Sequence, residues 1–400
     1  MILSKLDTDL YKFTVSNSYK LLYPQAEGTF EFTDRSKRVY TDEELKEVRA
    51  ELFKLKDLGM SEIQFNWVCK NIPYINKDYW EWLRDSFNFE PMKIDCYLDE
   101  NKHLQIKVTD LMYRVTLYEV PILAIISEYL FSKNRYDFGA TIEKLNNKIK
   151  IANENHLVFS EFGTRRRCNN TVQQHIISIL KEKCPTFSGT SNVHFACEYK
   201  LKAIGTYPHE WPMFHAAITG GYIEANNYSM EDWVKVYDGY LGTALIDAFT
   251  TPVFLKNFSK KLAHLFDGVR QDSGDEYKIG NMVIDRYKEL GIDPRKKFII
   301  FSNALDFEKY SDIARYFEGK IGVSAGIGTN LTNDPVIIGN DNYKPANIVM
   351  KLTRCRINSK QDWHNCIKLS DDVGKEMGNR SDVLMAKYQL GLIDYLSYNA

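Results

Sequence analysis

The stretch 205–211 places one histidine in a setting that suits chemistry. Residues 199–204 alternate apolar and polar side chains as a strand does, and Gly205 then lets the backbone turn. Pro208 fixes its own φ and keeps the preceding residue out of the helical region, so we expect a stiff loop that carries His209 at a strand end. Because an imidazole titrates near neutral pH, a histidine held in this way suits catalysis.

The surroundings of His209 do not predict a zinc site. The His-Glu-x-x-His motif needs a second histidine four residues on, but Met213 stands there, Pro212 interrupts the expected helix, and the next histidine is His215, for which we expect a structural role. Seven cysteines are scattered along the chain, and none forms a Cys-x-x-Cys pair. Their spacing predicts neither a structural metal site nor a disulfide framework.

Three consecutive arginines, at 165–167, follow the apolar segment 157–159. Guanidinium groups bind phosphate or carboxylate through paired N–H donors, so one or two of these side chains could grip an anion, although a solvated surface run is the alternative. On a strand Arg165 and Arg167 share a face, whereas on a helix the three side chains fan out over about 200°.

Three further loops contain small or acidic residues after apolar segments. The loop 188–192 is small enough for a ligand to approach the backbone, and the loop 270–275 combines an arginine with two carboxylates that suit a sugar diol or a hydrated cation. The loop 324–330 offers backbone N–H groups and the Thr329 hydroxyl to a phosphate, although it is neither a Walker A loop nor a dinucleotide fingerprint. Each loop alone also reads as an ordinary turn. Together with His209 and the arginines they predict a pocket for an anionic, phosphorylated sugar.

Short apolar segments must position these loops. We expect strands at 157–159, 245–249, 268–270, 298–301 and 320–323, and helices at 172–183 and 307–317. Strands that alternate with helices predict a parallel sheet or barrel with its active site at the strand carboxyl ends. The predicted fold class is therefore α/β, with an irregular parallel TIM-like barrel over residues 141–344.

The segments before and after this predicted barrel show different sequence patterns. We expect a strand at 29–32, an amphipathic helix at 42–57, a hairpin at 94–108 and an apolar helix at 121–133. A further strand at 346–352 returns to this first part of the chain. We therefore predict a smaller α/β sandwich-like domain formed by residues 1–140 together with 345–400.

Composition excludes several classes of function. The 400 residues carry a net charge of −1, so no overall basic field attracts nucleic acid or a membrane. The longest apolar run, 120–126, is too short to span a bilayer, and the first residues lack the apolar region of a signal peptide. We expect a cytoplasmic globular protein without nucleic-acid or membrane partners.

An ordered set of motifs resembles nicotinate phosphoribosyltransferase. Any one of them is weak evidence, but the set runs from residue 7 to beyond residue 330 and therefore covers most of the chain. The motifs are Asp7–Lys12, Phe162–Arg167, Gly189–Asn192, Gly205–Thr206 with His209–Trp211, Arg270 with Asp272–Asp275, Ser302–Asn303 and Gly326–Thr329.

The resemblance implies a reaction. Enzymes of this family join nicotinate to 5-phosphoribosyl-1-pyrophosphate, which gives nicotinate mononucleotide and pyrophosphate in the first step of NAD salvage from nicotinate. The reaction is coupled to ATP hydrolysis through a phosphorylated histidine, matched here by His209, and it uses Mg²⁺. The resemblance also implies a homodimer in which the partner chain contributes Tyr11.

Site residues follow from the same resemblance. Nicotinate is expected to contact Tyr11, Thr206 and Arg270. The phosphoribosyl pyrophosphate contacts are expected to be Arg165, Arg167, Asp272, Ser273, Gly274, Asn303, Gly328 and Thr329. Substrate oxygens are expected to hold most of the Mg²⁺, with Asp272 or Asp275 as its protein contact.

Alternative functions remain open on the residues alone. A nicotinamide-using phosphoribosyltransferase would bind a neutral amide and would not need Arg270 beside the ring, whereas a quinolinate enzyme would need more cations in the pocket. A non-catalytic sugar-phosphate sensor on the same barrel would bind the sugar and release no pyrophosphate.

Overall fold

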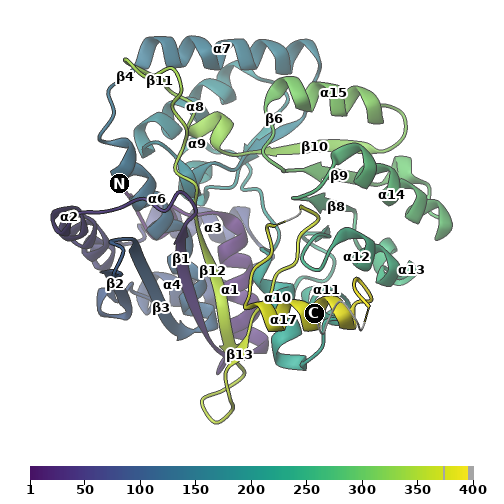
Figure 1. Cartoon of the computed structure of the whole chain (residues 1–400). Coiled ribbons are helices and arrows are strands. Elements are labelled where there is room, and N and C mark those ends of the chain that lie inside the picture. The colour runs from purple at the N-terminus through teal and green to yellow at the C-terminus, as the bar shows by residue number, and fades with distance from the viewer. Residues whose placement is uncertain (373, 395–400) are drawn as a thin grey trace.

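Two sheets organise the computed structural model, which describes residues 1–372 and 374–394 (Figure 1). One is a five-stranded antiparallel sheet in the order β13-β12-β1-β3-β2, and the other is a six-stranded parallel sheet in the order β6-β5-β10-β9-β8-β7. A separate two-stranded pair joins β4 (Tyr136–Asp137) to β11 (Val336–Ile337). Residue 373 and residues 395–400 lie outside the described residues, and both belong to the segment 345–400 that we predicted as part of the smaller domain.

The antiparallel sheet joins the two ends of the chain. Its strands are β1 (Glu27–Asp34), β2 (Ile94–Leu98), β3 (Leu104–Leu111), β12 (Ile348–Arg356) and β13 (His364–Asn365). The strand predicted at 346–352 is confirmed as β12, which pairs along β1 from Glu27↔Arg356 to Asp34↔Ile348. The predicted hairpin at 94–108 is confirmed as β2 and β3.

Helices cover this sheet and begin where local sequence favours them. They are α1 (Leu10–Leu22), α2 (Asp42–Phe53), α3 (Glu62–Asn71), α4 (Lys77–Asp85), α5 (Met112–Val115) and α6 (Glu119–Phe131), with short 3-10 turns at 54–57, 91–93 and 116–118. Thr41 and Glu44 form a reciprocal capping box that starts α2, and acidic residues in its first turn suit the helix dipole. None of the helices in the described residues has the length and apolar character of a membrane-spanning segment.

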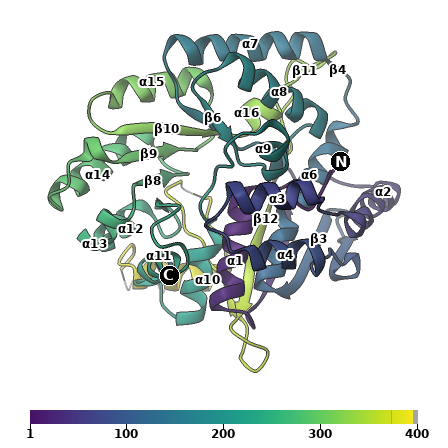
Figure 2. The same ribbon diagram turned by 180° about the vertical axis from the view of Figure 1, so that it is seen from behind.

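The parallel sheet consists of short, largely buried strands joined through helices. Its strands are β5 (Phe159–Glu161), β6 (Phe187–Thr190), β7 (Thr243–Leu245), β8 (Gly268–Gln271), β9 (Phe298–Phe301) and β10 (Gly322–Ile327). The helices are α7 (Phe138–Glu154), α8 (Asn170–Lys183), α9 (Val193–Tyr199), α10 (Glu210–Thr219), α11 (Ala225–Tyr237), α12 (Thr251–Asn257), α13 (Lys260–Leu265), α14 (Glu276–Glu289), α15 (Phe307–Phe317), α16 (Thr329–Thr332) and α17 (Arg380–Gln389). Both ribbon views place α7, α14 and α15 on the outside of this sheet (Figure 2).

The parallel α/β arrangement is confirmed, but strand pairing does not close it into a barrel. The ladder ends at β6 and β7, and no pairing within the described residues joins these two edges. The strand predicted at 199–204 is wrong apart from a single parallel bridge between Thr190 and Ala203. Asn192 caps α9, which continues to Tyr199, and Lys200 then adopts a left-handed conformation (φ 51°) that ends the helix and prevents an extended segment.

Helix α10 fixes the direction of the chain after His209. Pro212 does not interrupt it, because a proline in the first turn removes an N–H that has no partner within the helix. Trp211 and Phe214 are buried against Tyr19 of α1 with ring centroids 5.1 and 5.0 Å apart. His215 has the structural role we expected, since its ring nitrogens contact the Trp211 carbonyl (2.8 Å) and a carboxylate of α11 (3.1 Å).

Gly268 provides a test of how tightly β8 packs beside β9. A Cβ at Gly268 would lie 2.4 Å from the backbone oxygen of Phe298, which cannot move without disturbing the ladder. We expect Gly268→Ala to lower the free energy of unfolding by about 2 kcal/mol or more, measured by urea denaturation. Gly59→Ala is the matched control, because a Cβ there meets nothing within 4 Å. Equal urea midpoints for the two variants would contradict this packing.

Candidate active site

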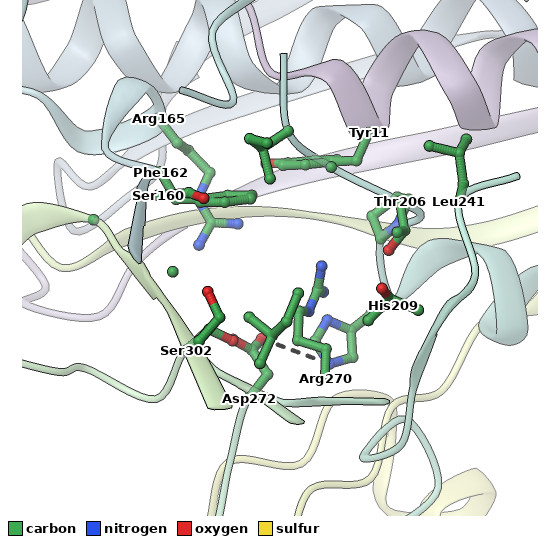
Figure 3. A pocket seen from close by; sticks show the side chains of 18 of the residues that line it. Tyr11, Ser160, Phe162, Arg165, Thr206, His209, Leu241, Arg270, Asp272 and Ser302 are labelled. Carbon is green, nitrogen blue, oxygen red and sulfur yellow. Dashed lines mark hydrogen bonds and ion pairs between the residues drawn. The ribbon is translucent and has the colours of Figure 1, made fainter. Parts of the chain in front are cut away.

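A cavity of about 690 Å³ lies between the two sheets. The antiparallel part contributes Tyr11, Phe30 and residues 350–352 of β12 to its wall. Loops at the carboxyl ends of the parallel strands contribute many of the other polar groups, as expected for a parallel α/β fold. Figure 3 shows Tyr11 and Arg165 on one side of this space and His209, Arg270 and Asp272 on the other.

His209 is paired with a buried carboxylate that the sequence analysis did not identify. It stands at the N-cap of α10, but its side chain does not cap the helix. Instead His209 Nε2 lies 2.9 Å from Asp247 Oδ1 and 3.8 Å from Asp272 Oδ2. Asp247 is fully buried, and its second oxygen accepts from the Ser273 hydroxyl at 2.7 Å and lies 3.5 Å from Lys368 Nζ.

The charges around this pair decide its protonation. Burial, followed by the positive charge of Lys368, lowers the pKa of His209 to about 4, although Asp247 acts in the opposite direction. Burial alone would raise the pKa of Asp247, but His209 and Lys368 hold it well below its ordinary value. Near neutral pH the pair therefore consists of a neutral imidazole and a carboxylate.

This protonation state assigns roles to the two ring nitrogens. Nε2 must carry the proton that it donates to Asp247, so Nδ1 carries the lone pair. No hydrogen bond to Nδ1 is found among the described residues. His209 is therefore oriented as a nucleophile whose conjugate charge Asp247 can stabilise.

Arg270 is a cation on the cavity wall. It belongs to β8 and lines the cavity, and Figure 3 shows its guanidinium near the His209 ring. Within residues 1–372 and 374–394 it makes no ion pair or side-chain hydrogen bond, and its Nε is buried. A guanidinium in this state suits an anionic ligand, and its planar donors match a carboxylate.

The three arginines at 165–167 point in different directions, because residues 164–166 form a 3-10 turn and neither a strand nor a regular helix. Arg165 and Arg166 line the cavity, and Arg165 lies 3.4 Å from Glu119. The family resemblance assigned no ligand contact to Arg166, whose side chain forms no ion pair or hydrogen bond in the described part of the chain.

Arg167 corrects one of the sequence-based site predictions. Its side chain is fully buried away from the cavity and donates to Asp7 (2.8 and 3.0 Å) and Glu128 (2.8 Å). The remaining donors reach Gln173 and the Met1 carbonyl. With its donors taken, Arg167 holds the N-terminal segment against the arginine turn and does not contact a ligand.

The acidic loop also separates into ligand-facing and supporting residues. Asp272 lines the cavity, and its Oδ1 accepts from the Ser302 hydroxyl at 2.7 Å. Asp275 caps α14 by accepting from the Lys278 backbone, so it does not fit the predicted role at Mg²⁺ or ribose.

Three other predicted contacts of the sugar substrate, Ser273, Gly274 and Asn303, stand behind Asp272 and do not line the cavity. The Ser273 hydroxyl donates to Asp247, and Asn303 Nδ2 donates to the Gly274 carbonyl at 3.2 Å. Gly274 has a φ of 81°, which favours glycine, and its N–H donates to Asp372. These residues position the site.

The glycine-rich loop does lie on the cavity wall, which includes Gly326 near the end of β10 and Gly328 and Thr329 just after it. A Cβ at Gly328 would lie 3.2 Å from the Phe162 carbonyl, so the two strand-end loops approach each other closely. Thr206 and Tyr11 also line the cavity. Tyr11 lines the cavity of its own chain, and its contribution by a partner chain stays a prediction.

A divalent cation finds only a partial set of ligands. Single ligand atoms of His209, Asp247 and Asp272 all lie within 4.8 Å of one another. Because His209 and Asp247 bind each other, Asp272 is the carboxylate of this group that can turn an oxygen toward the cavity. Mg²⁺ prefers oxygen ligands and keeps several from water or phosphate, so Asp272 with substrate oxygens fits this ion.

Buried charge also borders the cavity, because Glu119 and Glu210 line its wall. Lys12 of α1 is fully buried and forms ion pairs with Glu119 (2.5 Å) and Glu210, the residue after His209. Only the tertiary structure reveals this trio, because its members lie far apart in the sequence. Asp247 was easier to find, since it is a single carboxylate at the end of an apolar run.

Fold and site together define an α/β enzyme that binds an anionic, phosphorylated substrate at the carboxyl ends of parallel strands. The model of the nicotinate phosphoribosyltransferase (NAPRTase) family matches residues 157–392, and the model of its N-terminal domain matches residues 6–127. The chain therefore belongs to the nicotinate phosphoribosyltransferase family, as the sequence motifs predicted.

Individual relatives agree with this assignment. The chain is 38% identical to nicotinate phosphoribosyltransferase of Desulforapulum autotrophicum, with 96% of this chain and 97% of the relative covered. The corresponding protein of Chromohalobacter salexigens is 37% identical, with 98% and 99% covered. The crystal structure of nicotinate phosphoribosyltransferase from Porphyromonas gingivalis superimposes with a TM-score of 0.94 at 43% identity, over 98% of this chain and 100% of that chain.

The two arginines at 165 and 167 are expected to respond differently to mutation. Arg167→Met leaves the buried Asp7 and Glu128 carboxylates unpaired and should lower the free energy of unfolding by about 3 kcal/mol or more. Arg165→Met should leave the thermal midpoint nearly unchanged and raise KM for the phosphorylated substrate. Scanning calorimetry and initial rates distinguish the two variants. An unchanged thermal midpoint in Arg167→Met would contradict the structural role of Arg167 and favour the predicted ligand contact.

The protonation of His209 is testable by NMR on enzyme labelled with ¹⁵N-histidine, with the His209 signals identified by their loss in His209→Ala. Because its pKa is lowered to about 4, the ring should stay neutral, with Nε2 protonated, from pH 8 down to pH 5. A ring whose charge was stabilised mainly by Asp247 would instead gain its proton above pH 6.5. Titration at or above that pH would contradict the neutral assignment.

Proposed function

We propose that the cavity catalyses transfer of the phosphoribosyl group from 5-phosphoribosyl-1-pyrophosphate to nicotinate, with coupled ATP hydrolysis through His209. The observation that carries the proposal is one cavity that contains both an unpaired Arg270 and the neutral His209 paired with Asp247. The first suits the carboxylate of nicotinate, and the second suits phosphoryl transfer.

Nicotinate is proposed to lie between Arg270 and the aromatic side of the cavity. The guanidinium would bind the carboxylate through two parallel N–H donors, and Tyr11 and Phe162 offer ring faces to the pyridine. Thr206 lies beside Arg270 and His209 in Figure 3, where it limits the space for the ring. A neutral amide would leave the partly buried Arg270 charge uncompensated, which favours nicotinate over nicotinamide.

The phosphoribosyl pyrophosphate is proposed to cross the cavity from the glycine-rich loop to the arginine turn. Gly328 and Thr329 would hold the 5-phosphate, Asp272 would contact the ribose hydroxyls, and Arg165 with Arg166 would face the pyrophosphate. Ser273, Gly274 and Asn303 would support Asp272 from behind. Arg167 is not part of this proposal.

The transfer follows from positioning and charge. The ring nitrogen of nicotinate forms a bond to C1 of the ribose while the bond from C1 to the pyrophosphate oxygen breaks. Positive charge develops on the ribose, and Asp272 is the nearby carboxylate that can stabilise it. Arg165 and Arg166 neutralise the charge that accumulates on the leaving pyrophosphate. When bound, Mg²⁺ would neutralise further phosphate charge, with Asp272 as its protein contact.

The proposed ATP step uses the protonation of the histidine pair. Nδ1 of His209 attacks the γ-phosphorus, ADP leaves, and the ring becomes positively charged. The carboxylate of Asp247 stabilises that charge through the Nε2 proton, and Ser273 and Lys368 keep Asp247 in place. Water later hydrolyses the phosphohistidine. The added phosphoryl charge would order the arginine turn and tighten sugar binding.

Several coarser features belong to the same proposal. We propose that residues 1–140 with 345–400 and residues 141–344 act as two domains, and that the parallel sheet functions as an irregular, incompletely closed barrel. The pairing of β12 with β1 supports the first division. A homodimer and a cytoplasmic location remain predictions.

Product formation tests the proposal directly. With labelled nicotinate, phosphoribosyl pyrophosphate and Mg²⁺, wild type should form nicotinate mononucleotide faster in the presence of ATP. His209→Ala should retain slow transfer and lose the ATP stimulation, whereas His264→Ala, at an exposed histidine, should behave as wild type. Nicotinamide and quinolinate run in parallel should give little product. If none of the three bases gives product although the protein binds the sugar phosphate, the non-catalytic sensor is favoured. If only nicotinamide gives product, the nicotinamide-using phosphoribosyltransferase is favoured.

A further inference from the structure

Lys351 is a cation on the cavity wall that neither the sequence motifs nor the proposed site uses. It lies in the middle of β12, in the antiparallel sheet, and lines the cavity with its neighbours Met350 and Leu352. No side-chain hydrogen bond or ion pair of Lys351 is found within residues 1–372 and 374–394. A partly buried lysine in a fold normally has such a partner.

The groups that face Lys351 do not supply one. Arg165 and Lys368 carry the same charge and repel it, whereas Glu119 and Asp272 attract it. Glu119, however, is bound by Lys12 at 2.5 Å and also lies 3.4 Å from Arg165.

The remaining carboxylates near Lys351 are also occupied. Asp272 accepts from Ser302. Glu31, which stands opposite Lys351 in the register of β1 and β12, lies 3.4 Å from Lys107. Glu210 of α10, a helix that packs against β12, binds Lys12. Each of these carboxylates already has another partner, so the Lys351 ammonium is left without one in the described residues.

We propose that Lys351 binds the diphosphate group of the phosphorylated substrate together with Arg165, and that it releases this group as pyrophosphate leaves. The inference rests on the proposed function. Arg270 is reserved there for a carboxylate and the glycine-rich loop for the 5-phosphate, so the diphosphate is the anion left to match these two cations. The polyphosphate of ATP has the same chemistry and is the alternative source.

Proton uptake gives this inference a distinctive signature. Burial, followed by the charges of Lys368 and Arg165, lowers the pKa of Lys351 to about 7 in the free protein. A bound anion raises that pKa, so above pH 7 the lysine must take up a proton when the diphosphate binds. A lysine with only a structural role would bind no additional proton.

The experiment is calorimetric titration of the full chain with inorganic pyrophosphate and Mg²⁺ at pH 8, in buffers of different ionisation enthalpy. Wild type should take up a large fraction of one proton per site. Lys351→Met should bind pyrophosphate about 10- to 100-fold more weakly and without this uptake. Lys351→Arg should retain most of the affinity without the uptake, because arginine stays charged.

Controls separate this inference from folding and from the proposed function. Lys360→Met removes an exposed lysine between β12 and β13 and should match wild type. The thermal midpoint of Lys351→Met should not fall, because an unpaired charge is replaced by an apolar chain of similar length. Unchanged pyrophosphate affinity and proton uptake in Lys351→Met would overturn the inference even if wild type forms nicotinate mononucleotide.

The source of the phosphate is distinguished by a second titration with ATP. If Lys351→Met binds ATP more weakly but binds pyrophosphate as wild type does, the assignment is also overturned. Weakening of pyrophosphate binding, matched by a raised KM for phosphoribosyl pyrophosphate, supports it. Failure of the proposed function is a separate result, namely the absence of product with the wild-type enzyme.

Discussion

The hydrogen bond between His209 and the buried Asp247 is the interaction on which the rest of the site depends. It requires three separate parts of the chain to meet, because the histidine begins α10, the carboxylate follows β7, and Lys368 comes from the segment after β13. Ser273, after β8, supplies a further donor. Since a carboxylate without these partners could not stay charged at zero exposure, the parallel strands and the C-terminal segment must dock together before the histidine is oriented.

Some charged groups around the site are paired with one another, whereas others on the cavity wall are not. Lys12 forms ion pairs with Glu119 and Glu210, and Arg167 forms ion pairs with Asp7 and Glu128, so these buried ions connect separate segments of the chain. On the cavity wall, Arg166, Arg270 and Lys351 have no matching carboxylate in the described residues. Such unpaired cations lower the stability of the free protein. An anionic substrate compensates their charge, and the free energy gained in this way can hold the substrate in the reactive orientation.

Much of the fold could be predicted, since the helix at 307–317 and the strand at 298–301 have the predicted bounds and the hairpin at 94–108 is present. The strand before His209 could not, because the Asn192 cap and the left-handed Lys200 favour a helix and a turn that apolar alternation does not reveal. Within the site, Arg165, Asp272 and Thr329 line the cavity, and their contacts with the sugar substrate stay predictions, whereas Asp275 caps α14. The family resemblance identified the motifs, but it did not show which side chains within each motif line the cavity.

The sequence by itself determined the family, the α/β class and the loops that carry His209 and Arg270, because these follow from local residue order. Only the tertiary structure decided that Asp247 and Lys368 set the charge of His209, that Arg167 is an internal ion pair, and that Lys351 reaches the cavity. The physical reason is that the charge state of each group depends on distance and burial, which arise only when segments that are separated in the sequence pack together.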